Sequence, residues 1–106
     1  MKKKEKNVIV YYASEENAYE ISRSTGNRRD VLSSIRLDII DDGVDETQAE
    51  RNVESLKYCL ENDGYGYVEY ENAAEYNIII GVAYHGKTKH ITDLIKECRK
   101  EITSMF

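Results

Sequence analysis

Proline is absent from this sequence of 106 residues, and glycine and cysteine are scarce. Without a proline- or glycine-rich stretch there is no candidate linker, so a chain of this length is expected to form one domain, residues 1–106, around one core. The lysine run MKKKEK is not followed by an apolar segment long enough for a signal peptide or a membrane span. We therefore expect a cytoplasmic protein with a flexible basic tail at residues 1–6.

Cysteine and histidine are equally limited, with two residues of each. Cys59 and Cys98 stand where a helical pattern requires an apolar residue, which favours reduced core thiols over a disulfide or a metal pair. His85 and His90 are five residues apart, a spacing that places them on one face of neither a helix nor a strand. Since no activated serine or acid–histidine pair is recognisable either, we predict no metal, no cofactor and no enzymatic activity.

Hydrophobic patterning predicts an α+β sandwich in the order β-α-β-α-β-β-α, with a mainly antiparallel sheet and helices packed on it. The β-branched and aromatic residues of NVIVYY predict a strand at 7–12. Ser14 is a suitable first residue of a helix and Gly26 a suitable stop, so we predict a helix between them. The alternation in IRLDII predicts a second strand between Ile35 and Ile39, although a helix competes upstream.

The second half of the chain has clearer periodicity. Apolar residues from Ala49 to Leu60 at spacings of four, three and four predict an amphipathic helix over 45–62. YGYVEYE and EYNIIIGVAYH, joined by residues 72–74, predict a β-hairpin. A last apolar stripe predicts a helix over 91–105.

Charge is unevenly distributed along the chain. Between Asp30 and Glu75 there are thirteen acids and three bases, a net charge of −10, whereas the two ends together carry +5. Such a bias has two explanations. The acids form a solvent-exposed face without a specific function, or they form a surface that attracts a basic partner and repels nucleic acid. Tyrosines interleave the acids, and tyrosine supplies contact area at low entropic cost. The predicted partner-binding residues are Glu46, Glu50, Glu54, Glu61, Asp63, Tyr65, Tyr67, Glu69, Tyr70, Glu71 and Glu75.

Two local motifs offer competing functions. The segment 19–36 resembles a bacterial helix-turn-helix in the spacing of its apolar residues and Gly26, and would make Arg28, Arg29 and Arg36 the DNA-binding residues. The stretch GVAYHGKT satisfies the pattern of a phosphate-binding loop. However, only eighteen residues follow it, too few for a later strand to carry the acidic magnesium partner, so we predict no specific nucleotide binding.

Small size, no prolines, many lysines and asparagines, an acidic middle and no catalytic arrangement together resemble the profile of anti-CRISPR and anti-restriction proteins carried by phages and plasmids. Immunity proteins against nuclease toxins share this profile. The resemblance implies a non-enzymatic inhibitor in the bacterial cytoplasm that occupies a basic, nucleic-acid-binding surface, such as that of a CRISPR effector or another nuclease. The resemblance rests on overall profile and assigns no residue roles.

Overall fold

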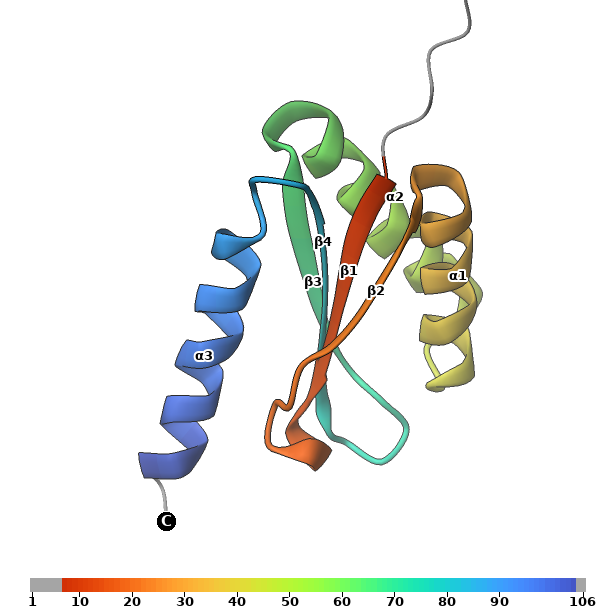
Figure 1. Cartoon of the computed structure of the whole chain (residues 1–106). Helices are drawn as coiled ribbons and strands as arrows, with labels where there is room; N and C mark the ends of the chain where they lie inside the picture. Colours follow the sequence, from red (N-terminus) through yellow and green to blue (C-terminus); the bar gives the residue numbers. More distant parts are fainter. Residues whose placement is uncertain (1–6, 105–106) are drawn as a thin grey trace, which may run out of the picture.

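The computed structural model describes residues 7–104, in which an antiparallel sheet lies between two helical layers (Figure 1). The strands β1 (Asn7–Ser14), β2 (Ser22–Asn27), β3 (Tyr65–Glu71) and β4 (Asn77–Tyr84) have the spatial order β2-β1-β4-β3. Helices α1 (Arg28–Asp41) and α2 (Glu46–Asp63) cover one face, and α3 (Lys89–Ser104) covers the other. The basic tail predicted at 1–6 and the last residue of the predicted final helix lie outside the described residues.

The α+β class and the antiparallel sheet are confirmed. The short 3₁₀ helix η1 (Glu15–Asn17) is the first helical element, and the α1–α2 pair occupies the place of the second, so the predicted order β-α-β-α-β-β-α holds. The strand predicted from YGYVEYE matches β3, and α2 begins and ends within one residue of its predicted bounds. The firmest sequence patterns therefore located their elements correctly.

The helix predicted between Ser14 and Gly26 is wrong beyond its first turn. Ser14 does begin a helical turn, because its side-chain oxygen accepts a hydrogen bond from the backbone N–H of Glu16 at 3.2 Å. The turn stops at Ala18 and Tyr19, whose φ angles of 53° and 57° are left-handed. The chain then returns as β2, an edge strand with no fully buried side chain. A helix over this segment would have had no apolar stripe to bury. As a strand, the segment forms backbone hydrogen bonds with the N–H and C=O groups of β1.

The strand predicted between Ile35 and Ile39 is also wrong, since both residues belong to α1. The alternation depended on Leu37, which is 57% exposed and contributes nothing to the core. The buried residues Leu32, Ile35 and Ile39 recur at spacings of three and four, which is the period of a helix packed by one stripe. Asn27 caps this helix by accepting a hydrogen bond from the backbone N–H of Asp30 at 2.9 Å.

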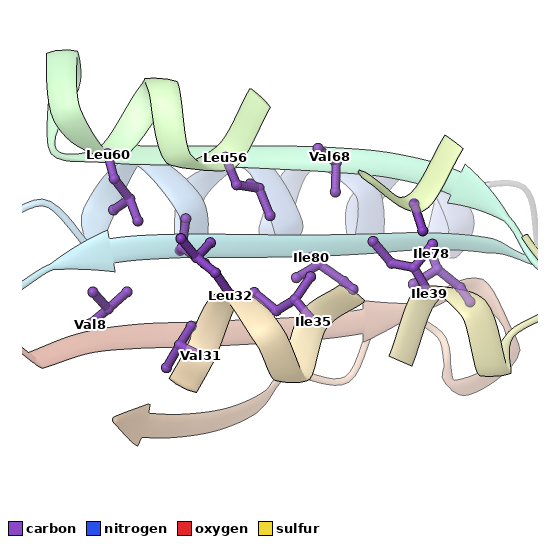
Figure 2. Close-up of a cluster of buried hydrophobic side chains, with 12 residues drawn as sticks. Val8, Val31, Leu32, Ile35, Ile39, Leu56, Leu60, Val68, Ile78 and Ile80 are labelled. Carbon is purple, nitrogen blue, oxygen red and sulfur yellow. The ribbon is translucent and has the colours of Figure 1, made fainter. Parts of the chain in front are cut away.

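Two hydrophobic clusters hold the layers together. The larger lies between the sheet and the α1–α2 pair, where side chains from both helices meet alternate residues of three strands (Figure 2). The smaller lies under α3 and contains Tyr11, Ile79, Ile91 and Ile95. Because both faces are covered, the central strand β4 is apolar along nearly its whole length, and all but its two end residues are buried.

The cysteines belong to different layers, and both are free thiols, but each is half-buried and not a fully buried core residue as predicted. Cys59 of α2 lies against Gly66 of β3, where an added Cβ would clash with the cysteine side chain. Gly81 of β4 likewise leaves room for Ile91 of α3. Glycine at these two positions lets each helix approach the sheet closely.

Candidate functional site

The acidic residues predicted on α2 are largely paired with arginines of the neighbouring helix. An Nη atom of Arg36 lies 2.7 Å from a carboxylate oxygen of Glu46 and 3.5 Å from one of Glu50. Arg28 lies 3.6 Å from Glu61. Two of the three arginines of the DNA-binding alternative, Arg28 and Arg36, thus neutralise part of the predicted acidic surface. Within residues 7–104, Glu54 and Asp63 are exposed and form no ion pair.

The predicted tyrosines and acids of β3 divide between the two faces of the sheet. The strand register places Tyr65, Tyr67, Glu69 and Glu71 on the α3 side and Tyr70 on the α1–α2 side. The ring of Tyr65 stacks on His90 with centroids 4.1 Å apart, so it serves packing at the start of α3. The eleven predicted residues therefore do not form one continuous surface. Helix α2 covers one face of the sheet, whereas Tyr65, Tyr67, Glu69 and Glu71 of β3 lie on the other face, which α3 covers.

A different acidic region forms where three segments meet at one end of the sheet. The backbone N–H of Ala73 donates to the Asp42 carbonyl oxygen at 2.9 Å, which joins the β3–β4 loop to the end of α1. The backbone N–H of Asn77 donates to the Glu15 carboxylate at 3.0 Å, which joins β4 to η1. We call the place where these three segments meet the acidic end. The carboxylates that the segments carry there, with Glu71 on the α3 side of the sheet, are Glu15, Glu16, Asp38, Asp41, Asp42, Glu71 and Glu75.

The acidic end contains uncompensated negative charge. Segments 12–20, 37–50 and 61–80 contain no lysine or arginine. Among residues 7–104, none of the carboxylates of the acidic end takes part in an ion pair. Burial, followed by the neighbouring carboxylates of Asp42 and Asp41, raises the pKa of Asp38 above its usual value. Burial is therefore the main cause of the raised pKa of Asp38, and the like charges of Asp42 and Asp41 add to it.

Tyrosines form the inner wall of the acidic end. The hydroxyl of Tyr70 donates to a carboxylate oxygen of Asp42 at 2.5 Å, linking β3 to the end of α1. Burial, this hydrogen bond and the charge of Asp42 raise the pKa of Tyr70 far above its usual value. Burial also raises the pKa of Tyr12, with further contributions from Asp42 and Asp38. These phenols therefore stay protonated and act as donors toward the carboxylates.

Sequence reasoning identified only Glu71, Glu75 and Tyr70 of this region. It missed Glu15 and Glu16 and the three aspartates at the end of α1, because they lie far apart in the sequence. The available signal was the absence of any base in three separate segments.

A second feature is a groove between the outer surfaces of α1 and α2, with a volume of about 360 Å³. Helix α1 lines it with Arg28, Arg29, Leu32, Ser33 and Arg36, and α2 with Val53 and Lys57. All three arginines of the DNA-binding alternative thus line one groove. Sequence reasoning did not connect them with Lys57, although the spacing of three to four residues on each helix defines such a face. We call this feature the α1–α2 groove.

The helix-turn-helix itself is not formed. Its first helix would occupy residues that make the turn after η1 and strand β2, and only α1 is helical as that alternative requires. In GVAYHGKT, the first four residues belong to β4 and not to a loop. The side chain of Lys87 lies over Gly64, the residue that ends α2. Neither motif therefore has the geometry that its sequence pattern implies.

Comparison of the chain with protein-family models, with curated proteins and with solved structures gives no significant match. Across residues 7–104, no three His, Cys, Asp or Glu side chains are grouped as metal ligands. In the same part of the chain, no helix is both long and apolar enough to cross a bilayer. Function must therefore be inferred from the acidic end and the α1–α2 groove.

Proposed function

We propose that this protein is a non-enzymatic inhibitor that binds a basic surface of another protein through its acidic end. The observation that carries the proposal is the meeting of three acid-rich segments, none of which contains a basic residue. Such a region creates a negative potential that speeds encounter with a positively charged partner and disfavours nucleic acid.

The internal contacts of the acidic end support a rigid binding surface. Asp42 is held by the Tyr70 hydroxyl through its side chain and by Ala73 through its carbonyl, and Glu15 is held by the Asn77 backbone. Carboxylates that are already positioned lose less conformational entropy on binding than mobile ones. Exposed Tyr76, beside the loop, adds aromatic contact area.

Strongly basic protein surfaces commonly bind nucleic acid. A protein that covers such a surface blocks the access of nucleic acid to it. This reading agrees with the profile shared by anti-CRISPR, anti-restriction and nuclease-immunity proteins. The partner class we propose is therefore a bacterial nuclease or nucleic-acid-guided effector with a basic substrate channel.

Charge reversal at the acidic end tests the proposal. We expect Glu71→Lys/Glu75→Lys to weaken capture of basic nucleic-acid-binding proteins from bacterial lysate by about tenfold or more, because attraction becomes repulsion. The control Glu54→Lys/Asp63→Lys changes net charge equally but lies on α2, away from the acidic end. Captured nucleases are then assayed for substrate cleavage with each variant. Equal capture and inhibition by both variants would contradict the proposal.

A titration against duplex DNA separates the proposal from direct DNA binding. We expect no saturable binding by the wild type even at low salt, where electrostatic attraction would be strongest. A salt-dependent complex that weakens with Arg28→Ala or Arg29→Ala would favour DNA binding instead.

A further inference from the structure

The α1–α2 groove has a charge pattern opposite to that of the acidic end. Arg28 and Arg36 stand near its two ends, and both are already engaged by glutamates of α2. Arg29 and Lys57 also line the groove, and within residues 7–104 neither forms an ion pair. The groove therefore presents two cations that no acid of the described residues pairs with.

The groove also has an apolar surface. Leu32 and Val53 line it, Leu32 being almost fully buried in the core and Val53 packed against it. A site with cationic walls and an apolar floor suits a ligand that carries both carboxylates and an apolar side chain. Arginine is well suited to such recognition, because its planar fork binds carboxylates bidentately.

The dimensions and surroundings of the groove decide between ligand classes. The part of α1 that lines the groove runs from Arg28 to Arg36, eight residues apart or about 12 Å along the helix axis. An extended peptide covers that distance with about four residues. A longer polyanion would run past the groove onto a helical layer in which 28–41 and 46–63 carry eight acids and five bases. The surroundings therefore repel nucleic acid but leave room for a short acidic ligand.

We propose that the α1–α2 groove binds a short acidic peptide segment of a partner protein, with carboxylates at Arg29 and Lys57 and an apolar side chain on Leu32 and Val53. This site is separate from the acidic end and does not depend on the function proposed for it.

The test uses three blocked five-residue peptides: Glu-Glu-Leu-Glu-Glu, its glutamine counterpart Gln-Gln-Leu-Gln-Gln, and Glu-Glu-Ser-Glu-Glu. We expect the first peptide to shift amide NMR signals of residues 28–36 and 53–57, with a Kd of about 0.1–1 mM for so few contacts. The glutamine peptide should not bind detectably, and the serine peptide should bind a few-fold more weakly. Equal binding of all three, or shifts elsewhere, would overturn the proposal.

Matched variants locate the interaction. Arg29→Ala/Lys57→Ala should weaken binding of the first peptide at least about fivefold, through loss of two charge contacts. Arg51→Ala removes an exposed cation of α2 that does not line the groove, and should leave binding within twofold of the wild type. Glu71→Lys/Glu75→Lys should also leave it unchanged. If the double alanine variant does not fold, Arg29→Gln and Lys57→Gln are measured singly, and unchanged affinity in both overturns the proposal.

Two other ligands are tested in parallel. Tighter binding of a twelve-nucleotide single-stranded DNA than of the peptide, lost in Arg29→Ala/Lys57→Ala, would replace the peptide with a nucleic-acid backbone. Concentration-dependent association in analytical ultracentrifugation, lost in the same variant, would identify a second copy as the occupant. A monomeric wild type that does not bind the oligonucleotide supports the peptide.

Discussion

The α1–α2 groove and the acidic end are built mostly from the same acid-rich middle of the chain. The groove nevertheless presents positive charge, whereas the acidic end presents negative charge. In the α1–α2 groove, acids of α2 face arginines of α1, and two further cations stay unpaired. At the acidic end, three acid-rich segments meet, and none of them contains a basic residue. Net charge along a sequence therefore does not determine surface potential, because packing decides which charges become neighbours.

The largest expected effect in this comparison concerns Tyr70, which attaches the acidic end to the sheet. We expect Tyr70→Phe to lower the free energy of unfolding by about 1.5 kcal/mol, because the hydrogen bond to the Asp42 carboxylate is lost. Urea denaturation at pH 7 measures this effect. The control is Tyr67→Phe on the opposite face of β3, where the side chain is 45% exposed. Equal stability of the two variants would show that the hydrogen bond does not support the acidic end.

The same variant has a predictable pH dependence. The unfolded chain ionises Tyr70 near its ordinary value of 10.0, whereas the folded protein holds the proton to higher pH. The folded state then binds more protons, so the stability that Tyr70 provides is present below pH 10 and declines as pH rises above it. The difference between wild type and Tyr70→Phe should therefore shrink in alkali.

A smaller effect is expected from the ion pairs beside the α1–α2 groove. Glu46→Gln/Glu50→Gln should lower the free energy of unfolding by about 1 kcal/mol or less, since both glutamates are exposed and solvent screens them. The loss should vanish in about 1 M salt. Glu54→Gln, which removes an acid without an ion pair among residues 7–104, is the control. A loss that persists in high salt would indicate packing and not charge pairing.

The smallest effect should be a gain in stability at the acidic end. The raised pKa of Asp38 means that the folded state binds its proton more tightly than the unfolded chain, so stability falls as pH rises through that pKa. Asp38→Asn should therefore stabilise the protein at pH 7 by a few tenths of a kcal/mol, after discounting for solvent exposure. At about pH 3 the difference should disappear. Asp63→Asn at the end of α2 is the control, and an equal gain there would show that the burial of Asp38 and its neighbouring carboxylates are not the cause.

Hydrophobic patterns correctly predicted the elements in which the buried positions are clearly apolar. They failed for α1 and β2, in which exposed residues obscure the pattern. The helix over 46–63 could be read from the helical period of its apolar residues, and the hairpin that follows it from two runs of apolar and aromatic residues joined by a short turn. The exposed Leu37 produced an alternation of apolar and polar residues that predicted a strand where α1 lies. Strand β2 contains almost no apolar residues, because it is an edge strand. Local patterns report burial, so they are weakest where burial is low.

By itself, the sequence determined the α+β class, the order of the elements and the excess of acids between Asp30 and Glu75. Only the tertiary structure decided which of those acids are neutralised and which accumulate. Arg36 meets Glu46 because α1 and α2 pack side by side, and Glu15 meets Asn77 across 62 residues because β1 pairs with β4. Electrostatic interactions depend on distance in space, and the sheet pairing and helix packing that set those distances join residues far apart in the sequence.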